Sequence, residues 1–376
     1  MKQHKNLNMI AGSIPLAGKL LPGALLLGSI FAVAQTAPSP SATSVVPPQG
    51  GQGYGAQGYR TSPPPNPTLI KDANPPKDVV DIELLTWPEL YKKIHEEGKT
   101  TAIVFNGDTE QRGPQDVIGG HSFIAHGTAE LIAKKLGNAL VAPVLPFALG
   151  GADPNHPGGL GISADTFTAV NQEVAEQLIR NGFKNIVLIG DHGGGQKQLH
   201  DLALKLDAQY SPQGVRVIYT DGPYTQSNNE FDAWLAQNGY PPSAHGGIPD
   251  TSELLYLEGN NNWVRKELLP TALGDPPRPG FGSVGGGGRR PDGSGANGAG
   301  QASATTATDA PQRQHSDSGT PRINNGITGD ARRSTAELGK RFIDLKVDNG
   351  VAQIKQLLSQ PPQHATASAS PTPTGR

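Results

Sequence analysis

The chain has 376 residues, a formal net charge of −2 at neutral pH and no cysteine. The missing cysteines exclude disulfide bonds, thiolate metal ligands and cysteine nucleophiles, so any metal site must use His, Asp, Glu or water. The balanced charge gives no reason to expect a nucleic-acid partner. The 49 glycines and 34 prolines gather in particular segments, so fewer residues should fold than the length suggests.

The N-terminus has the pattern of an export signal. A positively charged start precedes the apolar run from 20 to 31, and Ala-Val-Ala at 32–34 fits the small-x-small cleavage rule. A membrane anchor is the alternative, but the run is too short to span a bilayer comfortably, so no stable anchor is expected. We therefore predict a signal peptide over residues 1–34 and a periplasmic or secreted protein after cleavage near Ala34.

Low-complexity segments divide the rest of the chain. Residues 35–78 are rich in Pro, Ser, Gly and Gln and cannot bury enough apolar surface to offset ordering entropy, which predicts a disordered linker. Residues 281–321 are predicted as a low-complexity insertion in a surface loop, and residues 361–376 as a disordered tail. The folded domain is therefore expected over 79–280 and 322–360.

The folded part alternates helix and strand patterns. Thr86 can cap a first helix that ends at Gly98, and Ser122 can cap a second helix. Apolar spacing predicts the remaining elements in chain order: strands over 101–105 and 139–145, a helix over 163–181, a strand over 185–189, a helix from 196, a strand over 215–219 and a last helix over 336–358. This alternation predicts an α/β fold with a mainly parallel central sheet covered on both faces.

Ligand-type side chains follow the predicted strands, where function collects in parallel sheets. Glu110 follows the strand over 101–105, and His192 follows the strand over 185–189 among glycines that leave the imidazole unobstructed. His121 directly precedes the expected helix at Ser122. Two imidazoles, one carboxylate and an open position form a catalytic zinc pattern, and the same set suits manganese or iron. We predict one divalent metal, with zinc preferred, on these three residues.

The same residues also fit simpler roles. A phosphate loop would need Gly-Lys-Ser/Thr at its end, and Gly195 is followed by Gln-Lys-Gln instead. Each of the three candidate ligands, taken alone, also suits a solvated turn or a helix cap. His245 and Asp250 lie in a later glycine-containing loop, where either could act as a general base or add a ligand. His245 could equally be a loop histidine with no role.

Three segments resemble the signature segments of the creatininase family of amidohydrolases. They read TEQRGP at 109–114, IGDHGGGQ at 189–196 and AHGGIPDTSE at 244–253, where the family typically shows Thr-Glu-x-His-Gly-Pro, Asn-Gly-His-Gly-Gly-Asn and His-Ala-Gly-x-x-Glu-Thr-Ser. The resemblance covers about 79–280 and 325–358. It implies a three-layer α/β/α fold, metal-dependent hydrolysis of cyclic or linear amides, and a homo-oligomer, often a hexamer.

The chain also departs from the family pattern. The resemblance aligns Arg112 with the family's first histidine ligand, His121 with its bridging aspartate and Asp250 with its final glutamate. Gly194 stands where the creatininase branch, with Asn-Gly-His-x-Glu-Asn, has glutamate, although the Gly-Gly-Asn branch also lacks it. Glu110, His192 and His245 are retained. Arginine stays protonated and cannot ligate a cation. The changes therefore predict a mononuclear site of Glu110, His121, His192 and water, with Asp250 as a candidate further ligand.

The leading functional hypothesis is a metal-dependent hydrolase of C–N bonds that acts on a small-molecule amide. His245 or Asp250 would move the proton to the leaving nitrogen, and Arg112 would stabilise the oxyanion or hold a substrate carboxylate. The altered ligands and the export signal both argue against creatinine itself as the substrate. The alternative is a non-catalytic descendant that binds a metal or a small anionic ligand. A surface interaction protein that works through the insertion has only compositional support.

Overall fold

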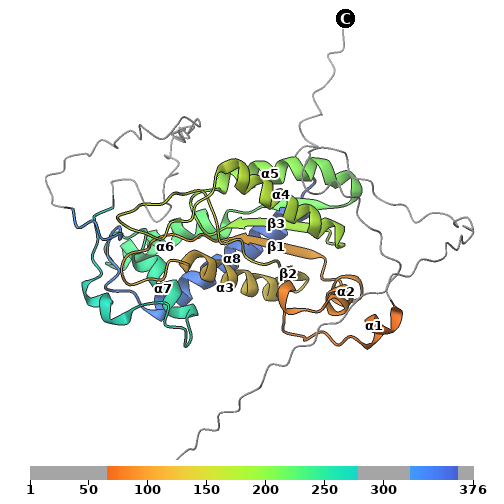
Figure 1. Cartoon of the computed structure of the whole chain (residues 1–376), viewed down its shortest axis with the longest axis horizontal. Helices are drawn as coiled ribbons and strands as arrows, with labels where there is room; N and C mark the ends of the chain where they lie inside the picture. Colours follow the sequence, from red (N-terminus) through yellow and green to blue (C-terminus); the bar gives the residue numbers. More distant parts are fainter. Residues whose placement is uncertain (1–65, 278–321, 363–376) are drawn as a thin grey trace, which may run out of the picture. The chain divides into compact units, whose positions relative to one another are not determined.

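Four parallel strands form the central sheet in the order β2-β1-β3-β4 (Figure 1). The computed structural model describes residues 66–277 and 322–362. Pairing joins Thr101 of β1 to Asn185 of β3, and Asn106 at the end of β1 to Gly190 at the end of β3. The strands are β1 Thr101–Asn106, β2 Ala139–Val141, β3 Asn185–Gly190 and β4 Arg216–Tyr219. Because β1 and β3 end side by side, the loops that follow them start from one edge of the sheet.

Helices cover both faces of this sheet, with α4 and α5 on one side and α3 and α8 on the other (Figure 1). The helices are α1 Pro67–Asp72, α2 Trp87–His95, α3 Gly120–Leu136, α4 Ala164–Arg180, α5 Gln196–Tyr210, α6 Ser227–Gln237, α7 Ile248–Leu257 and α8 Ala336–Ser359. Shorter helical turns are η2 Ile82–Leu84, η3 Ser211–Gln213, η4 Gly222–Gln226 and η5 Lys266–Thr271. No helix within the described ranges is long and apolar enough to cross a membrane.

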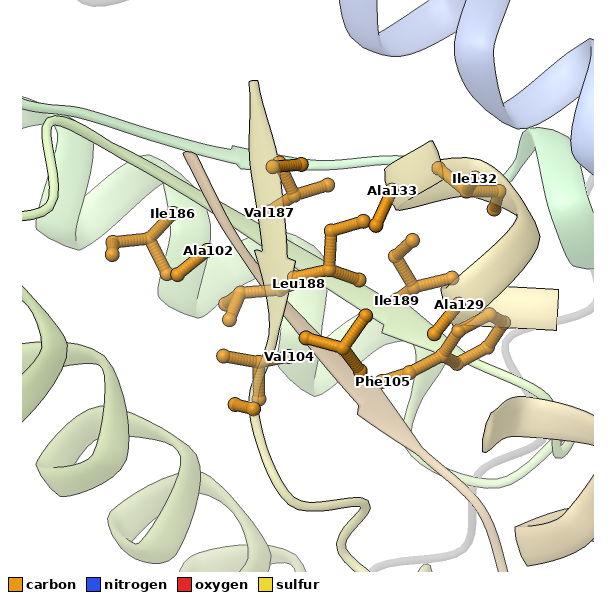
Figure 2. Close-up of a cluster of buried hydrophobic side chains, with 14 of the residues drawn as sticks. Ala102, Val104, Phe105, Ala129, Ile132, Ala133, Ile186, Val187, Leu188 and Ile189 are labelled. Atoms are coloured by element: carbon orange, nitrogen blue, oxygen red, sulfur yellow. The ribbon is translucent and has the colours of Figure 1, made fainter. Parts of the chain in front are cut away.

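The hydrophobic core follows from the alternation of side chains along β1 and β3. Both strands are almost entirely buried, because each lies between two neighbours and under helices on both faces. Figure 2 shows Phe105, Val187 and Ile189 on the same side of the sheet as three small or branched residues of α3, whereas alternate strand residues point to the other side. The α3 residues are Ala129, Ile132 and Ala133. This packing buries β1 and β3 up to their carboxyl ends.

The expected fold class is confirmed, and so are most of the predicted elements. Thr86 caps α2 as expected, in a capping box with Glu89, and Ser163 caps α4 through a hydrogen bond from the backbone N–H of Thr166. The strand expected over 139–145 is shorter and ends at Val141, and the chain pairs with β1 again only through a single bridge between Leu145 and Asn106.

Three boundaries differ from the sequence-based expectation. The second helix starts at Gly120 with Gly119 as its cap, so Ser122 lies inside the first turn and does not cap it. Asp250, expected in a glycine-containing loop, lies in the first turn of α7, which begins at Ile248. Helix α1 lies inside the segment predicted as a disordered linker over 35–78.

The ordered end of that linker is attached to α2. Lys92 Nζ donates to the carbonyl oxygen of Ala73 at 2.8 Å, and Lys93 Nζ donates to that of Pro76 at 2.9 Å. These lysines donate hydrogen bonds to backbone carbonyls of the segment. Apolar composition alone cannot predict an attachment of this kind. The predictions for residues 1–34, for the insertion over 281–321 and for most of 361–376 concern residues outside the described ranges.

Candidate metal centre

Three ligand-type side chains converge where β1, β3 and α3 meet. Glu110 follows β1, His192 follows β3 and His121 lies in the first turn of α3. One ligand atom from each lies within 4.8 Å of the other two. The first turn of α3 can approach β1 because residue 107 is glycine: a Cβ there would lie 2.5 Å from Ser122 Cα. The sequence-based expectation that these three residues come together is therefore met by the geometry.

His121 is oriented by hydrogen bonds on both ring nitrogens. Its Nδ1 lies 2.9 Å from Asp191 Oδ2, and its Nε2 lies 3.0 Å from Glu110 Oε1. A carboxylate on Nδ1 is the usual partner of a metal-ligating histidine, because it holds the proton there and leaves the Nε2 lone pair free. His121 therefore faces into the site, although it lies at a helix start.

His192 has a different arrangement. Its Nε2 lies 3.6 Å from both Glu110 Oε2 and Asp108 Oδ2, and the backbone N–H of Gly194 donates to its Nδ1 at 3.1 Å. A neutral ring that accepts on Nδ1 carries its proton on Nε2. Ligation of a metal through Nε2 therefore requires the Gly194 hydrogen bond to open. A side chain at Gly194 would lie 2.3 Å from the carbonyl oxygen of Leu149, so this loop has no room for a glutamate there.

His245 adds a third imidazole around Glu110. Its Nδ1 lies 3.3 Å from Glu110 Oε1, and its Nε2 lies 2.6 Å from the carbonyl oxygen of Gln111. An N–H on Nε2 satisfies that carbonyl, which leaves Nδ1 directed at the site. His245 is not one of the three converging ligands, and its place beside Glu110 suits a group that carries a proton.

Arg112 and Asp250 form a buried ion pair beside these residues. Arg112 Nη2 lies 2.8 Å from Asp250 Oδ2, and Nη1 lies 4.0 Å from Glu110 Oε1. None of the three guanidinium nitrogens of Arg112 has a well-directed hydrogen-bond acceptor among the described residues, so the contact is electrostatic in character. Asp250 Oδ2 also accepts the backbone N–H of Gly246 at 2.7 Å. Asp250 is therefore engaged with Arg112 and lies outside the converging ligand set.

The electrostatics of the cluster favour an anion at Glu110. Burial raises the pKa of Glu110, but hydrogen bonds from His121, His192 and His245 lower it more, and the net pKa lies far below its usual range. Burial lowers the pKa of His192 and of His245, and the hydrogen bond with Glu110 raises each pKa more, so both end above the usual value. A cation at the centre would meet an ionised carboxylate and compete with protons for these imidazoles.

Sequence reasoning missed four charged residues behind and beside the ligands: Asp108, Asp191, Glu253 and Lys346. Asp108 Oδ1 accepts the backbone N–H of Ala148 at 3.1 Å, which holds its carboxylate near His192. Lys346 was detectable in principle, because it interrupts the apolar face of α8 formed by Phe342, Ile343 and Val347. Nothing local indicated that its partner would be Asp191, 155 residues away.

The donor set suits a divalent metal. Two imidazoles and one carboxylate are ligands that zinc, manganese and iron accept, and the three protein donors leave positions for water or substrate. The carboxylate–histidine pair of Asp191 and His121 matches the outer arrangement of such sites. Arg112 beside the site stays protonated and cannot itself ligate a metal.

Comparisons with known proteins agree with the resemblance seen in the motifs. The family model described as "Creatininase: Creatinine amidohydrolase" matches residues 83–354. No curated protein matches the chain. A crystal structure of creatinine amidohydrolase (creatininase) has 19% identity and a TM-score of 0.52, and covers 75% of this chain and 99% of that one.

Two metal forms of creatininase are also similar. The structure "Creatininase Mn" has 18% identity and a TM-score of 0.53, and covers 75% of this chain and 100% of that one. A mutant creatininase of "Zn-Zn type" has 19% identity and a TM-score of 0.53, with 75% and 99% covered. At these identities the likeness establishes the fold, and the metal and reaction must be argued from this chain's own residues.

Proposed function

Because the chain belongs to the creatininase family, we propose that it is a hydrolase that uses one divalent metal to cleave a C–N bond of a small amide. The observation that carries the proposal is the convergence of Glu110, His121 and His192 within 4.8 Å. Zinc is the preferred metal, and manganese or iron also suits the donors. One metal is proposed instead of two because Arg112 replaces a histidine of the motif and cannot ligate.

A bound metal supplies a lowered pKa for water and polarises an amide carbonyl. The chain's own residues then have separate tasks. His245 has Nδ1 directed at Glu110 and Nε2 on a backbone carbonyl, so it is the proposed carrier of a proton to the leaving nitrogen. Asp250 is the second candidate for that task, although its carboxylate is paired with Arg112.

Arg112 is assigned a different role from direct substrate contact. Its side chain is 0% exposed, so a substrate cannot reach the guanidinium in this conformation. Its fixed charge, 4.0 Å from Glu110, can offset the carboxylates that a second metal would otherwise neutralise. We therefore propose that Arg112 stabilises an oxyanion by the electrostatic effect of its nearby charge and does not contact the substrate.

The loop after β3 supports a proposal about the substrate class. Gly194 is close-packed against Leu149, so the glutamate of the creatininase branch has no counterpart here. We propose a small linear or cyclic amide other than creatinine. We also propose that residues 1–34 are removed on export, so that hydrolysis takes place in the periplasm or outside the cell, and that the chain forms a homo-oligomer as the family resemblance implies.

Metal analysis and an amidase screen test the proposal together. Purified full-length protein, loaded with zinc or manganese and desalted, should retain about one metal per chain. Hydrolysis of a panel of linear and cyclic amides should disappear with a chelator and return with the metal. Two tightly held metals per chain would contradict the mononuclear site, and activity unaffected by chelation would contradict the metal mechanism.

A non-catalytic descendant is the second candidate, and one observation favours it. The Gly194 N–H on His192 Nδ1 holds the ring in a form that does not ligate through Nε2. A chain that only binds a metal or small anionic ligand needs no proton carrier. The substitution His245→Gln separates the two candidates: an enzyme loses turnover and keeps its metal, whereas a binder has no turnover to lose.

A further inference from the structure

Three buried charged residues lie behind the ligand His121. Lys346 of α8 has its Nζ 2.9 Å from Asp191 Oδ1 and 2.7 Å from Glu253 Oε1. The other oxygen of Asp191 lies 2.9 Å from His121 Nδ1. The side chains of Lys346, Asp191 and Glu253 are all at most 3% exposed. The contacts therefore form one chain from α7 and α8, through the loop after β3, to the metal centre.

We propose that Lys346 is a positioning residue of this centre, which fixes the Asp191 carboxylate and thereby the orientation of the His121 ring. The inference rests on the proposed function, because it concerns the ligand His121. It assigns a role in metal binding to a residue of the last helix, far along the chain from the three signature segments.

The geometry explains why Asp191 needs this partner. Lys346 occupies one carboxylate oxygen, so the carboxylate cannot rotate and the other oxygen stays on His121 Nδ1. Water cannot take the lysine's place easily, since Asp191 is only 2% exposed. With Nδ1 held as a donor to Asp191, Nε2 faces Glu110 and is the nitrogen that would exchange its proton for a metal.

A purely structural role for Lys346 would rest on the same contacts. Lys346 lies between two carboxylates, Asp191 and Glu253, and its ammonium lies 4.6 Å from the ring centre of Phe342. Removal of a buried charge that pairs two others costs stability in any protein. The test must therefore read the metal site itself as well as the stability of the fold.

Lys93 provides a matched control. It is a second buried lysine, 1% exposed, and its Nζ donates to the backbone carbonyl of Pro76 at 2.9 Å, with Glu97 at 3.9 Å. Its partners belong to the α1–α2 region and include none of the candidate ligands. Lys93→Met should therefore lower stability without changing the metal centre.

The experiment compares full-length Lys346→Met, Lys93→Met and unaltered protein. Metal affinity is measured by competition with a chromophoric zinc chelator, and ligand geometry by the visible absorption of the cobalt-substituted protein. Lys346→Met should weaken zinc binding by about 10- to 100-fold and alter the cobalt spectrum, which is the effect expected when an outer partner of a ligand is lost. Lys93→Met should leave both measurements unchanged.

A double-mutant cycle with Asp191→Asn tests whether Lys346 acts through Asp191. In the Asp191→Asn background, Lys346→Met should cause little further loss of zinc affinity, because the carboxylate that it orients is already gone. Fully additive losses would overturn the inference. If Lys346→Met fails to fold, Lys346→Gln serves instead, since it keeps an N–H donor and removes the charge.

The outcomes also separate this inference from the proposed function. Unaltered protein that retains no metal would overturn the mononuclear hydrolase, and with it the role of Lys346. Unaltered protein with one metal, together with a Lys346→Met chain of the same zinc affinity and cobalt spectrum, would overturn the positioning role alone.

Discussion

Arg112 and Asp250 are joined in a buried ion pair, with Nη2 of the arginine 2.8 Å from Oδ2 of the aspartate. The motif resemblance aligns both residues with metal-associated side chains of the creatininase family. In this chain they neutralise each other, and Arg112 extends its charge toward Glu110. Burial lowers the pKa of Arg112, but the charges of Asp250, Glu110, Asp116 and Asp191 raise it more, so the guanidinium stays a permanent cation. We interpret it as a substitute for a second metal.

Loss of that cation should destabilise the protein. Arg112→Met would leave the partly buried Asp250 without its ion-pair partner and Glu110 with less positive charge nearby. Breaking one side of a buried pair costs about 3–5 kcal/mol, so the free energy of unfolding in urea should fall by that order. The double variant Arg112→Met/Asp250→Asn should recover part of the loss. A single variant as stable as the unaltered chain would show that the pair contributes nothing.

Restoring the family's ligand types should restore the second metal. In Arg112→His/His121→Asp, an imidazole and a carboxylate return to the positions that the family motif gives them. The metal content measured after desalting should then rise from about one metal per chain to about two. Arg112→His alone should not reach two, because His121 supplies no bridging oxygen. An unchanged content in the double variant would contradict the idea that Arg112 displaces a metal.

The space around the guanidinium can be tested through Gly120. A Cβ at this position would lie 2.8 Å from Arg112 Nε and 2.9 Å from Cδ, so Gly120→Ala should displace the arginine or the start of α3. Overpacking of this kind costs about 1–3 kcal/mol, to be measured by urea unfolding. Gly151→Ala is the matched control, because a Cβ there meets no atom within 4 Å. Equal effects of both substitutions would mean that contact with Arg112 is irrelevant.

His126 should make stability depend on pH. Its Nε2 lies 3.0 Å from the buried Asp81 Oδ1, and this hydrogen bond raises the pKa of His126 more than burial lowers it. A raised folded-state pKa contributes stability that is fully present below the unfolded value of about 6.5 and is lost as pH rises through the folded value. The melting temperature of His126→Gln should therefore fall furthest below that of the unaltered chain in mild acid, and the gap should narrow in mild alkali. A gap independent of pH would contradict the ion pair.

The core strands and two of the ligands were predictable from local sequence. Apolar runs such as 101–105 and 185–189 favour buried strands whatever surrounds them, and parallel strands end at a common edge of the sheet. Glu110 and His192 directly follow β1 and β3, so their meeting required only the pairing of those strands. The start of α3 was harder to predict from the sequence, because a glycine cap supplies no side chain that marks it.

The sequence by itself determined the order of elements, the absence of thiolate chemistry and the positions of Glu110 and His192 after their strands. Only the tertiary structure decided that Arg112 is wholly buried against Asp250 and that Lys346 reaches Asp191 across 155 residues. The physical reason is the separation along the chain over which each effect acts. Periodicity and capping act over a few residues, whereas a buried charge is stable only where the complete fold brings an opposite charge to it.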